Sequence, residues 1–464
     1  MLLKNKLNKL KKELKNDNVL TNLEERYCYA TDAVNLKFDY EIPELVVFVE
    51  TIQDVQKVLK YANIHEIPII PRGAGTNMVG SCVSSKGGIV LNFSKMNKIL
   101  EINTTNMTVD VQPGVILGDL KAAVESVGLF YPPDPSNYKV STIGGSIAQS
   151  SGGALSFKYG TTKDYVMSLK VVLADGTLLT LGSETSKANL GYHLSQLIVG
   201  SEGTLAVIVE AKLKLLPRPK AAQLIVAYFD RIDSAVSAVN NIIKNHIFPA
   251  SLEFMDKNSI STVEDFLHVG LNTDKECLLL INLDGDPISL NSQALLLNDI
   301  LLKTDAASVI IPKSHIKSDL YLNARRSSYA ASARLAPDVV SDDIIVPRDK
   351  ISNLVYECYN LAEKYSIKMC LVGHIGDGNL HPQVILNLEN EEEYRNYINF
   401  RDRMYAHVKY LGGSISAEHG IGLEKKDFLK NTVDVETLNY MKSIKKVFDP
   451  KNILNPGKIF DINE

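Results

Sequence analysis

The sequence has few cysteines and no long apolar run. Its five cysteines are scattered through 464 residues, and no two of them are spaced as Cys-x-x-Cys. This spacing argues against a disulfide scaffold, a zinc ribbon and an iron–sulfur cluster. No apolar run reaches the roughly 18–20 residues of a membrane-spanning helix. We therefore expect a protein of the reducing cytoplasm without a transmembrane segment, either free or peripheral to the membrane.

Net charge is also scarce, at −4 with a pI near 6.2. So small a charge gives no general attraction to nucleic acid, and we expect no such partner. Hydrophobic residues make up 45% of the chain, as in globular proteins, and its length predicts two or three domains. At the N-terminus, Leu7, Leu10 and Leu14 recur at helical spacing among lysines. This pattern favours a helix docked on the protein over a membrane-surface anchor.

The order of predicted elements divides the chain at Pro217-Arg218-Pro219. Before this point extended and helical segments alternate, with Thr51 as one helix N-cap and Asp175-Gly176 as a hairpin turn. Beyond it, strands and helices predict an α+β sandwich with helices on one sheet face. We expect a helical lead, a first domain, a second domain and a C-terminal segment that returns to the first, at residues 1–40, 41–219, 220–412 and 413–464.

A glycine-rich loop follows the short apolar strand that ends at Ile70. Such a loop presents free backbone N–H groups at close range, which suits a pyrophosphate. It is neither a dinucleotide fingerprint of the Rossmann type nor a P-loop, so a tight turn and a phosphate cradle both remain open. The residues of interest are Pro71, Arg72, Gly73, Ala74, Gly75, Thr76, Asn77, Gly80 and Ser81.

Four further segments before residue 210 are rich in glycine, proline and small hydroxyl residues. Small side chains at this density allow the backbone to lie against a flat ligand, although a set of surface loops would show the same composition. The segments are 132–135, 141–153, 159–160 and 200–208.

Histidines cluster near the C-terminus, although the chain has only nine. His374 and His381 flank the turn Gly376-Asp377-Gly378, which must fold His381 back toward His374 for both to bind one metal. Glu418 and His419, adjacent and flanked by glycine, offer a third ligand. The alternative is that the histidines cap turns and the carboxylates are exposed.

Taken in order, these motifs resemble those of the FAD-linked oxidases of the vanillyl-alcohol oxidase and p-cresol methylhydroxylase fold. The resemblance runs from about residue 40 to the C-terminus. It is closest to the branch that contains D-lactate dehydrogenases, the glycolate oxidase flavin subunit and D-2-hydroxyglutarate dehydrogenase. The fold implied is α+β: a two-part FAD-binding domain at 41–219, and an α+β substrate domain with an antiparallel sheet at 220–412.

Carried over by motif, the loop from Arg72 to Ser81 would hold the FAD pyrophosphate. Relatives with covalent flavin have a histidine where this chain has Thr76, which implies non-covalent FAD. The resemblance assigns Glu202, Gly203 and Ile208 to the adenosine side. It assigns to the isoalloxazine and ribityl chain Pro133, Asp134, Pro135, Thr142, Gly144, Gly145, Ala148, Ser151, Gly152 and Tyr159.

The same resemblance implies that His374, His381 and Glu418 bind a divalent metal, which two imidazoles and a carboxylate leave open among zinc, iron and manganese. His419 would be the catalytic base. Arg325 would grip the substrate carboxylate, with Arg326 as the alternative, although either could form an ion pair on a helix surface. Asn379 would hydrogen-bond the substrate.

The expected function is oxidation of a small D-2-hydroxy acid, D-lactate or glycolate, to the 2-oxo acid. The stretch Ser341-Asp342-Asp343 is acidic where dicarboxylate-oxidising members need a cation, which favours a small acid. Without a second redox centre, the chain would pass electrons to an electron-transfer flavoprotein, an iron–sulfur subunit, a quinone or oxygen. The alternatives are a D-2-hydroxyglutarate dehydrogenase, a flavin-dependent transferase and a metal-dependent hydrolase.

Overall fold

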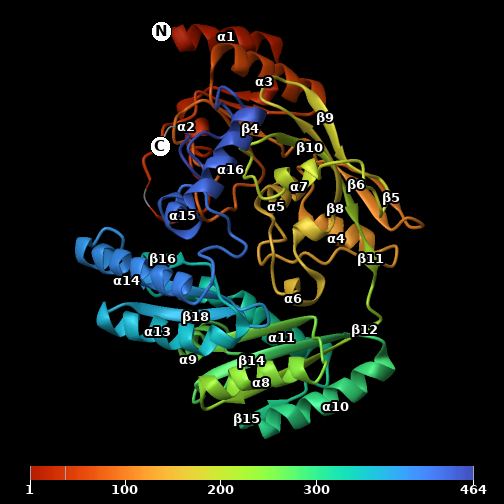
Figure 1. The fold of residues 1–464 in the computed structure, drawn as a ribbon, viewed down its shortest axis with the longest axis vertical. Coiled ribbons are helices and arrows are strands. Elements are labelled where there is room, and N and C mark those ends of the chain that lie inside the picture. Colours follow the sequence, from red (N-terminus) through yellow and green to blue (C-terminus); the bar gives the residue numbers. More distant parts are fainter. Residues whose placement is uncertain (1, 37, 463–464) are drawn as a thin grey trace. The chain divides into compact units, whose positions relative to one another are not determined.

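The computed structural model describes residues 2–36 and 38–462. It separates into two compact units. Unit 1 contains residues 1–151, 161–218 and 418–464, and unit 2 contains residues 152–160 and 219–417 (Figure 1). Among the described helices, none combines the length and the apolar character that crossing a membrane requires.

The first sheet of unit 1 has four strands in the order β1-β2-β4-β3. Helix α3 packs on it through Val55, Val58 and Leu59, and the N-terminal helix α1 adds Leu7 and Leu10 to the same core. The predicted docked N-terminal helix is therefore confirmed. The elements are α1 Leu2–Glu13, β1 Val19–Leu20, β2 Leu45–Phe48, α3 Ile52–His65, β3 Ile69–Arg72 and β4 Ile89–Asn92.

Local chemistry explains where α3 begins. Thr51 accepts a hydrogen bond from the Asp54 backbone, and the Asp54 carboxylate accepts one from the Thr51 backbone, so the predicted N-cap is confirmed as a reciprocal capping box. Strand β3 pairs parallel with β4, and its last residue, Arg72, opens the glycine-rich loop. The capped helix and its parallel strands therefore fix the start of that loop.

The second sheet of unit 1 is antiparallel, in the order β5-β6-β10-β8-β9. Strands β8 and β9 form the hairpin predicted at Asp175-Gly176. The elements are β5 Ile99–Asn103, β6 Thr108–Val111, β8 Val166–Val172, β9 Leu178–Gly182 and β10 Val207–Lys214, with a separate pair of β7 Leu129–Phe130 and β11 Leu216–Pro217.

Shorter helices and the C-terminal segment complete unit 1. The segment after residue 418 joins the first sheet through a parallel bridge between Ile69 and Leu454. The buried Lys445 ammonium donates to the Thr204 and Leu454 carbonyls and also pairs with Asp449. The helices are α2 Leu23–Tyr27, α4 Leu117–Glu125, α5 Ile143–Gln149, α7 Leu194–Ile198, α15 Lys426–Thr432 and α16 Val435–Phe448, with the 3₁₀ turns η1 Asn16–Asn18 and η2 Thr162–Asp164.

Unit 2 is built on one antiparallel sheet in the order β15-β12-β14-β13-β18-β19-β16, with β17 also paired to β19. The predicted antiparallel sheet is therefore confirmed. The strands are β12 Ala221–Phe229, β13 Ser251–Asp256, β14 Cys277–Gly285, β15 Ala306–Ile310, β16 Asp338–Ser341, β17 Ile344–Ile345, β18 Lys368–His374 and β19 Asn379–Leu386.

Helices cover both faces of this sheet. Leu224, Val226 and Tyr228 of β12 pack in one cluster with α9, α11 and α12. The intervening Ile225 and Phe229 point to the opposite face and are equally buried, and α8 and α10 contact β12 and β14. The expectation of helices on one face is therefore wrong, because a continuous apolar strand is buried on both faces.

Figure 1 labels most helices of unit 2. The helices are α6 Ser156–Tyr159, α8 Ile232–Lys244, α9 Lys257–Leu267, α10 Pro287–Lys303, α11 His315–Arg326, α12 Ser328–Ser332, α13 Ile351–Lys364 and α14 Glu391–Tyr410, with the 3₁₀ turn η3 Arg348–Lys350.

Candidate flavin and metal sites

Two side chains, Arg72 at the start of the glycine-rich loop and Asn77 inside it, hold the loop of unit 1 in place. The Arg72 guanidinium donates to the Thr31 carbonyl at 2.6 Å and lies over the Tyr29 ring. The Asn77 side-chain oxygen accepts from the backbone N–H groups of Val79 and Ser81. These contacts fix both ends of the loop while its middle stays open.

Four consecutive backbone N–H groups in this loop donate to nothing within the described part of the chain. They belong to Gly73, Ala74, Gly75 and Thr76. Backbone N–H groups left unpaired in a glycine-rich turn attract anions, because their dipoles converge on one point. The loop therefore has the donors that a phosphate group requires.

The loop lies against the start of α5. Thr142 caps this helix by accepting a hydrogen bond from the Gly145 backbone at 3.3 Å. A Cβ atom on Gly73 would lie 2.1 Å from the Thr142 hydroxyl oxygen, so glycine is required for this close approach. Thr142 and the loop also line one cavity of about 190 Å³.

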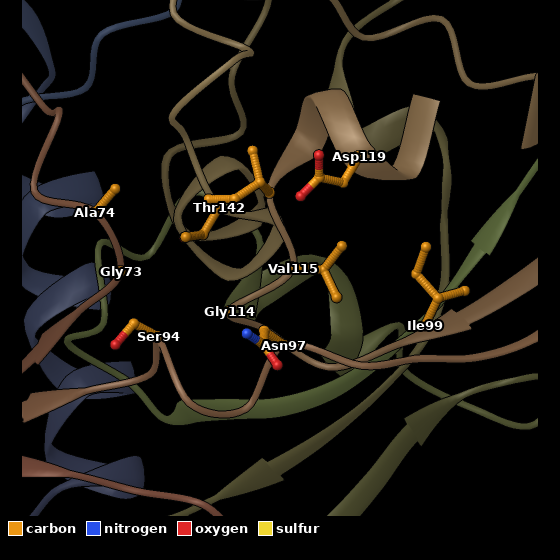
Figure 2. Close-up of a pocket in the computed structure, with 10 residues that line it drawn as sticks. Gly73, Ala74, Ser94, Asn97, Ile99, Gly114, Val115, Asp119 and Thr142 are labelled. Atoms are coloured by element: carbon orange, nitrogen blue, oxygen red, sulfur yellow. The ribbon is translucent and has the colours of Figure 1, made fainter. Parts of the chain in front are cut away.

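Figure 2 shows this cavity between the loop that carries Gly73 and Ala74 and the segment that carries Val115. Thr142 is drawn between Ala74 on one side and Asp119 and Ile99 on the other. The lining residues are Gly73, Ala74, Ser94, Asn97, Ile99, Gly114, Val115, Ile116, Asp119 and Thr142.

Glu202 is buried beneath the loop and holds three chain segments together. Its carboxylate accepts from the Ser81 hydroxyl at 2.5 Å and from the backbone N–H groups of Ile421 and Gly422. Burial raises the pKa of Glu202, and these hydrogen bonds offset only part of the rise. Asn455 donates to the Ser81 and Glu202 carbonyls. Both Glu202 oxygens are thus used inside unit 1, while its expected place near adenosine stays a prediction.

The other expected flavin residues divide between the units. In unit 1, Lys121 contacts the Pro133 carbonyl and the Asp134 carboxylate. In unit 2, the Tyr159 hydroxyl donates to Asp284 at 2.6 Å. Unit 1 also contains Pro135, Gly144, Gly145, Ala148, Ser151, Gly203 and Ile208, and unit 2 contains Gly152.

In unit 2, β18 and β19 form the hairpin that carries the two histidines. His374 pairs with Asn379 and Val372 pairs with His381, so both imidazoles project from the same sheet face as diagonal neighbours. Their ring centroids are 5.3 Å apart. The turn needs glycine, because Gly378 has a φ of +88° and a Cβ there would lie 2.1 Å from the Val346 carbonyl oxygen. The predicted return of His381 toward His374 is confirmed.

Glu253 of β13 lies beside this pair, because it pairs with His374 across the sheet. His374 Nδ1 is 2.6 Å from Glu253 Oε1, and Arg325 Nε of α11 is 3.0 Å from Glu253 Oε2. Burial alone would raise the pKa of Glu253, but His374, Arg325 and His381 together lower it below its ordinary value. Arg325 is thus placed beside the histidine pair by an ion pair.

His381 is oriented by the backbone. Its Nδ1 lies 3.3 Å from the Asp342 carbonyl oxygen. Both histidines therefore have Nδ1 directed at an oxygen acceptor, which selects the Nδ1–H tautomer and leaves the lone pair on Nε2. This is the arrangement found in metal-binding histidines.

The two buried aspartates after β16, Asp342 and Asp343, accept hydrogen bonds within unit 2. The Asp342 carboxylate accepts hydrogen bonds from Tyr405 and Tyr397 of α14. The Asp343 carboxylate accepts from the Asn379 side chain at 2.9 Å and from Ser416 and the Ala417 backbone. Both carboxylates therefore accept hydrogen bonds within unit 2, and the small acid that the acidic stretch predicts stays a prediction.

Asn379 donates from Nδ2 both to Asp343 and to the Ile344 carbonyl. Its two amide protons are thus used within unit 2. The segment after α14 is bridged to β17 between Ile345 and Ser414 and ends at Ala417, on Asp343. Glu418 and His419 belong to unit 1, where the Asn77 side chain donates to the His419 carbonyl at 3.1 Å.

Comparison with known families decides the class. The family described as FAD binding domain matches residues 43–182, and the family described as FAD linked oxidases, C-terminal domain, matches residues 218–459. The chain belongs to the FAD-linked oxidases. This membership argues against a metal-dependent hydrolase, because both halves of the chain match families named for FAD.

Relatives of this FAD-linked oxidase share most of its length. The glycolate oxidase subunit GlcD of Bacillus subtilis is 42% identical, over 94% of this chain and 92% of the relative. The D-lactate dehydrogenase of Anaerostipes hadrus is 36% identical, over 90% of this chain and 89% of the relative. Substrate-bound p-cresol methylhydroxylase has a similar fold, with a TM-score of 0.85 at 16% identity over 100% of this chain and 98% of that one.

Both expected groups fit the described residues. For FAD, the fit rests on the four N–H groups of residues 73–76 and on the missing Cβ of Gly73. For a divalent metal, it rests on two imidazoles on one face whose Nδ1 atoms are both oriented by oxygen acceptors.

Glu253 was not among the site residues predicted from the sequence. Its signal was an ionisable residue within a strand whose neighbours, Leu252 and Phe254, are apolar and buried. Such a residue is retained in a core only when it is paired, so its position alone indicated a hidden ion pair.

Proposed function

We propose that this FAD-linked oxidase oxidises a small D-2-hydroxy acid, D-lactate or glycolate, to the 2-oxo acid with a divalent metal. The support is the naming of its relatives, combined with the oriented histidine pair of the β18–β19 hairpin. FAD is held non-covalently, since Thr76 offers no nucleophilic imidazole in the loop.

His374 and His381 would hold the metal through Nε2, and the Glu418 carboxylate is the proposed third ligand. Glu418 directly follows Ala417, whose backbone N–H donates to Asp343. A metal bound there would supply a Lewis acid that lowers the pKa of the substrate hydroxyl. The donor set admits zinc, iron or manganese.

Arg325 binds the substrate carboxylate. Its side chain is largely buried, and Glu253 holds Nε without a well-aligned hydrogen bond. A guanidinium with one edge on a protein carboxylate retains its other donors for a second carboxylate. Arg326 stays the alternative for this contact.

His419 takes the hydroxyl proton, because an imidazole titrates near the working pH. The hydrogen on the α-carbon leaves with its electron pair as hydride, and the C–O bond becomes the carbonyl of the 2-oxo acid. Bound FAD supplies the acceptor for this hydride. Asn77 holds the backbone of His419 and so keeps the base in place.

Asn379 stays the proposed hydrogen-bond partner of the substrate, through its side-chain oxygen, because both of its amide protons are donated within the protein. It also orders Asp343, which accepts from the Ala417 backbone.

Reduced flavin must then pass two electrons to an acceptor outside the described chain. None of the five cysteines is paired, and three are buried. The acceptor is an electron-transfer flavoprotein, an iron–sulfur subunit or a quinone.

One alternative substrate is D-2-hydroxyglutarate, which carries a second carboxylate and belongs in the test. A transferase is the second alternative, because alkyldihydroxyacetonephosphate synthase has a similar fold, with a TM-score of 0.75 at 22% identity.

Anaerobic bleaching of the flavin tests the proposal. We expect D-lactate or glycolate to reduce the flavin, and L-lactate and D-2-hydroxyglutarate to react more slowly. His374→Ala should retain FAD and lose about 100-fold or more in rate, because a metal ligand supplies several kcal/mol to the transition state. His315→Ala, at an exposed position on α11, is the matched control. Failure of every 2-hydroxy acid to bleach the flavin would refute the proposal and favour the transferase.

A further inference from the structure

Glu253 contacts two residues of the proposed site, His374 and Arg325. It is 3% exposed in the central strand β13, between Leu252 and Phe254, which are buried in the core. A buried carboxylate is costly unless charged partners surround it. Glu253 has two such partners, on two different elements.

Each oxygen of this carboxylate holds one partner. Oε1 is 2.6 Å from His374 Nδ1 of β18, and Oε2 is 3.0 Å from Arg325 Nε of α11. His374 and Arg325 are 49 positions apart in the sequence. The two oxygens of the planar Glu253 carboxylate contact both of them. One carboxylate therefore contacts both the imidazole and the guanidinium.

The positions of His374 and Arg325 bear on which hydroxy acid fits the site. In a 2-hydroxy acid the hydroxyl and the carboxylate are on neighbouring carbons, whereas in a 3-hydroxy acid a further carbon separates them. A metal on His374 would take the hydroxyl oxygen and Arg325 would take the carboxylate, so the positions of these two residues would decide which hydroxy acid fits.

We infer that Glu253 is a positioning residue that holds His374 and Arg325 at the spacing of a 2-hydroxy acid and so rejects 3-hydroxy acids. This inference rests on the proposed function. It predicts two separate defects when Glu253 is altered: weaker metal binding through His374, and lost discrimination through Arg325.

Two variants separate charge from length. Glu253→Gln keeps the size of the side chain but removes its charge and turns an N–H₂ group toward one donor. Glu253→Asp keeps the charge but shortens the reach by one carbon. Glu276→Gln is the control, since Glu276 directly precedes β14 and forms an exposed ion pair with Lys257.

Zn²⁺ binding is measured by calorimetry on the FAD-loaded, metal-depleted protein, and oxidation is compared for 2-hydroxybutyrate and 3-hydroxybutyrate. Glu253→Gln should raise the Kd for Zn²⁺ by roughly 10- to 100-fold, as loss of a partner of a metal-binding histidine does. At saturating Zn²⁺ its KM for 2-hydroxybutyrate should rise more than its kcat falls. Glu253→Asp should recover part of the Zn²⁺ affinity, yet lower the preference for the 2-hydroxy isomer by about tenfold.

Glu276→Gln should match the wild type in both measurements. Unchanged Zn²⁺ affinity and unchanged isomer preference in Glu253→Gln that retains FAD would overturn the inference. If Glu253→Gln does not retain FAD, an unaltered preference in Glu253→Asp overturns it equally. A wild-type protein that binds no Zn²⁺ and oxidises neither isomer would instead refute the proposed function.

Discussion

A single missing side chain shapes the candidate flavin site at the residue scale. Gly73 has an ordinary backbone conformation, so its importance is spatial: a Cβ there would lie 2.1 Å from Thr142 Oγ1. The same residue begins the run of four unpaired backbone N–H groups. Close packing on one side and open donors on the other are what an anion-binding turn requires.

Gly73→Ala should therefore weaken FAD binding. Overpacking of this kind costs ~1–3 kcal/mol, which corresponds to roughly a 5- to 150-fold rise in the FAD dissociation constant. The measurement is flavin fluorescence during titration of the apoprotein. Gly118→Ala in α4 is the control, because the nearest atom to its added Cβ is 3.4 Å away. An unchanged FAD affinity in Gly73→Ala would show that the loop does not bear on the cofactor.

The partners of buried ionisable side chains could not be predicted from the sequence. The sequence shows Asp342 only as part of an acidic stretch, whereas in the structure its carboxylate accepts hydrogen bonds from tyrosines of α14. Glu253 belongs to no recognisable motif, yet its carboxylate contacts both His374, the candidate metal ligand, and Arg325, the candidate substrate arginine. The direction of a side chain depends on strand pairing and on helices distant in sequence, which a local motif does not contain.

The β18–β19 hairpin carries the site at the element scale. Its register, with His374 opposite Asn379, places both imidazoles on one face, and the turn satisfies this register only with glycine at 378. Both features were predictable, since two apolar runs flank a glycine-rich turn. The burial of both sheet faces was misjudged, although the continuous apolar runs of β12 and β14 indicated it.

Gly378→Ala should disturb this hairpin and weaken metal binding. Its φ of +88° is unfavourable for alanine, and the added Cβ would meet the Val346 carbonyl oxygen at 2.1 Å. Gly412→Ala is a matched control, because Gly412 has a φ of +77° with no atom within 4 Å of the added Cβ. We expect Gly378→Ala to raise the Kd for Zn²⁺ at least tenfold over Gly412→Ala, by calorimetry. Equal affinities would contradict the role given to the turn.

Two units, each with its own sheet, make up the whole molecule. Unit 1 contains the loop that fits a pyrophosphate, and unit 2 contains the histidine pair that fits a metal. The FAD binding domain family matches residues 43–182, and the C-terminal domain family of the FAD linked oxidases matches residues 218–459. The loop therefore lies in the first matched region and the histidine pair in the second. The central claim is that oxidation of a 2-hydroxy acid needs both a bound flavin and a bound metal.

Metal removal and restoration test this claim most directly. The protein is dialysed against a chelator, its retained FAD is confirmed by absorbance, and anaerobic bleaching by D-lactate or glycolate is timed before and after Zn²⁺, Fe²⁺ or Mn²⁺ is returned. The account predicts that depletion slows bleaching by about 100-fold or more and that one metal per chain restores it. Bleaching at the full rate in the metal-depleted, FAD-loaded protein would contradict it.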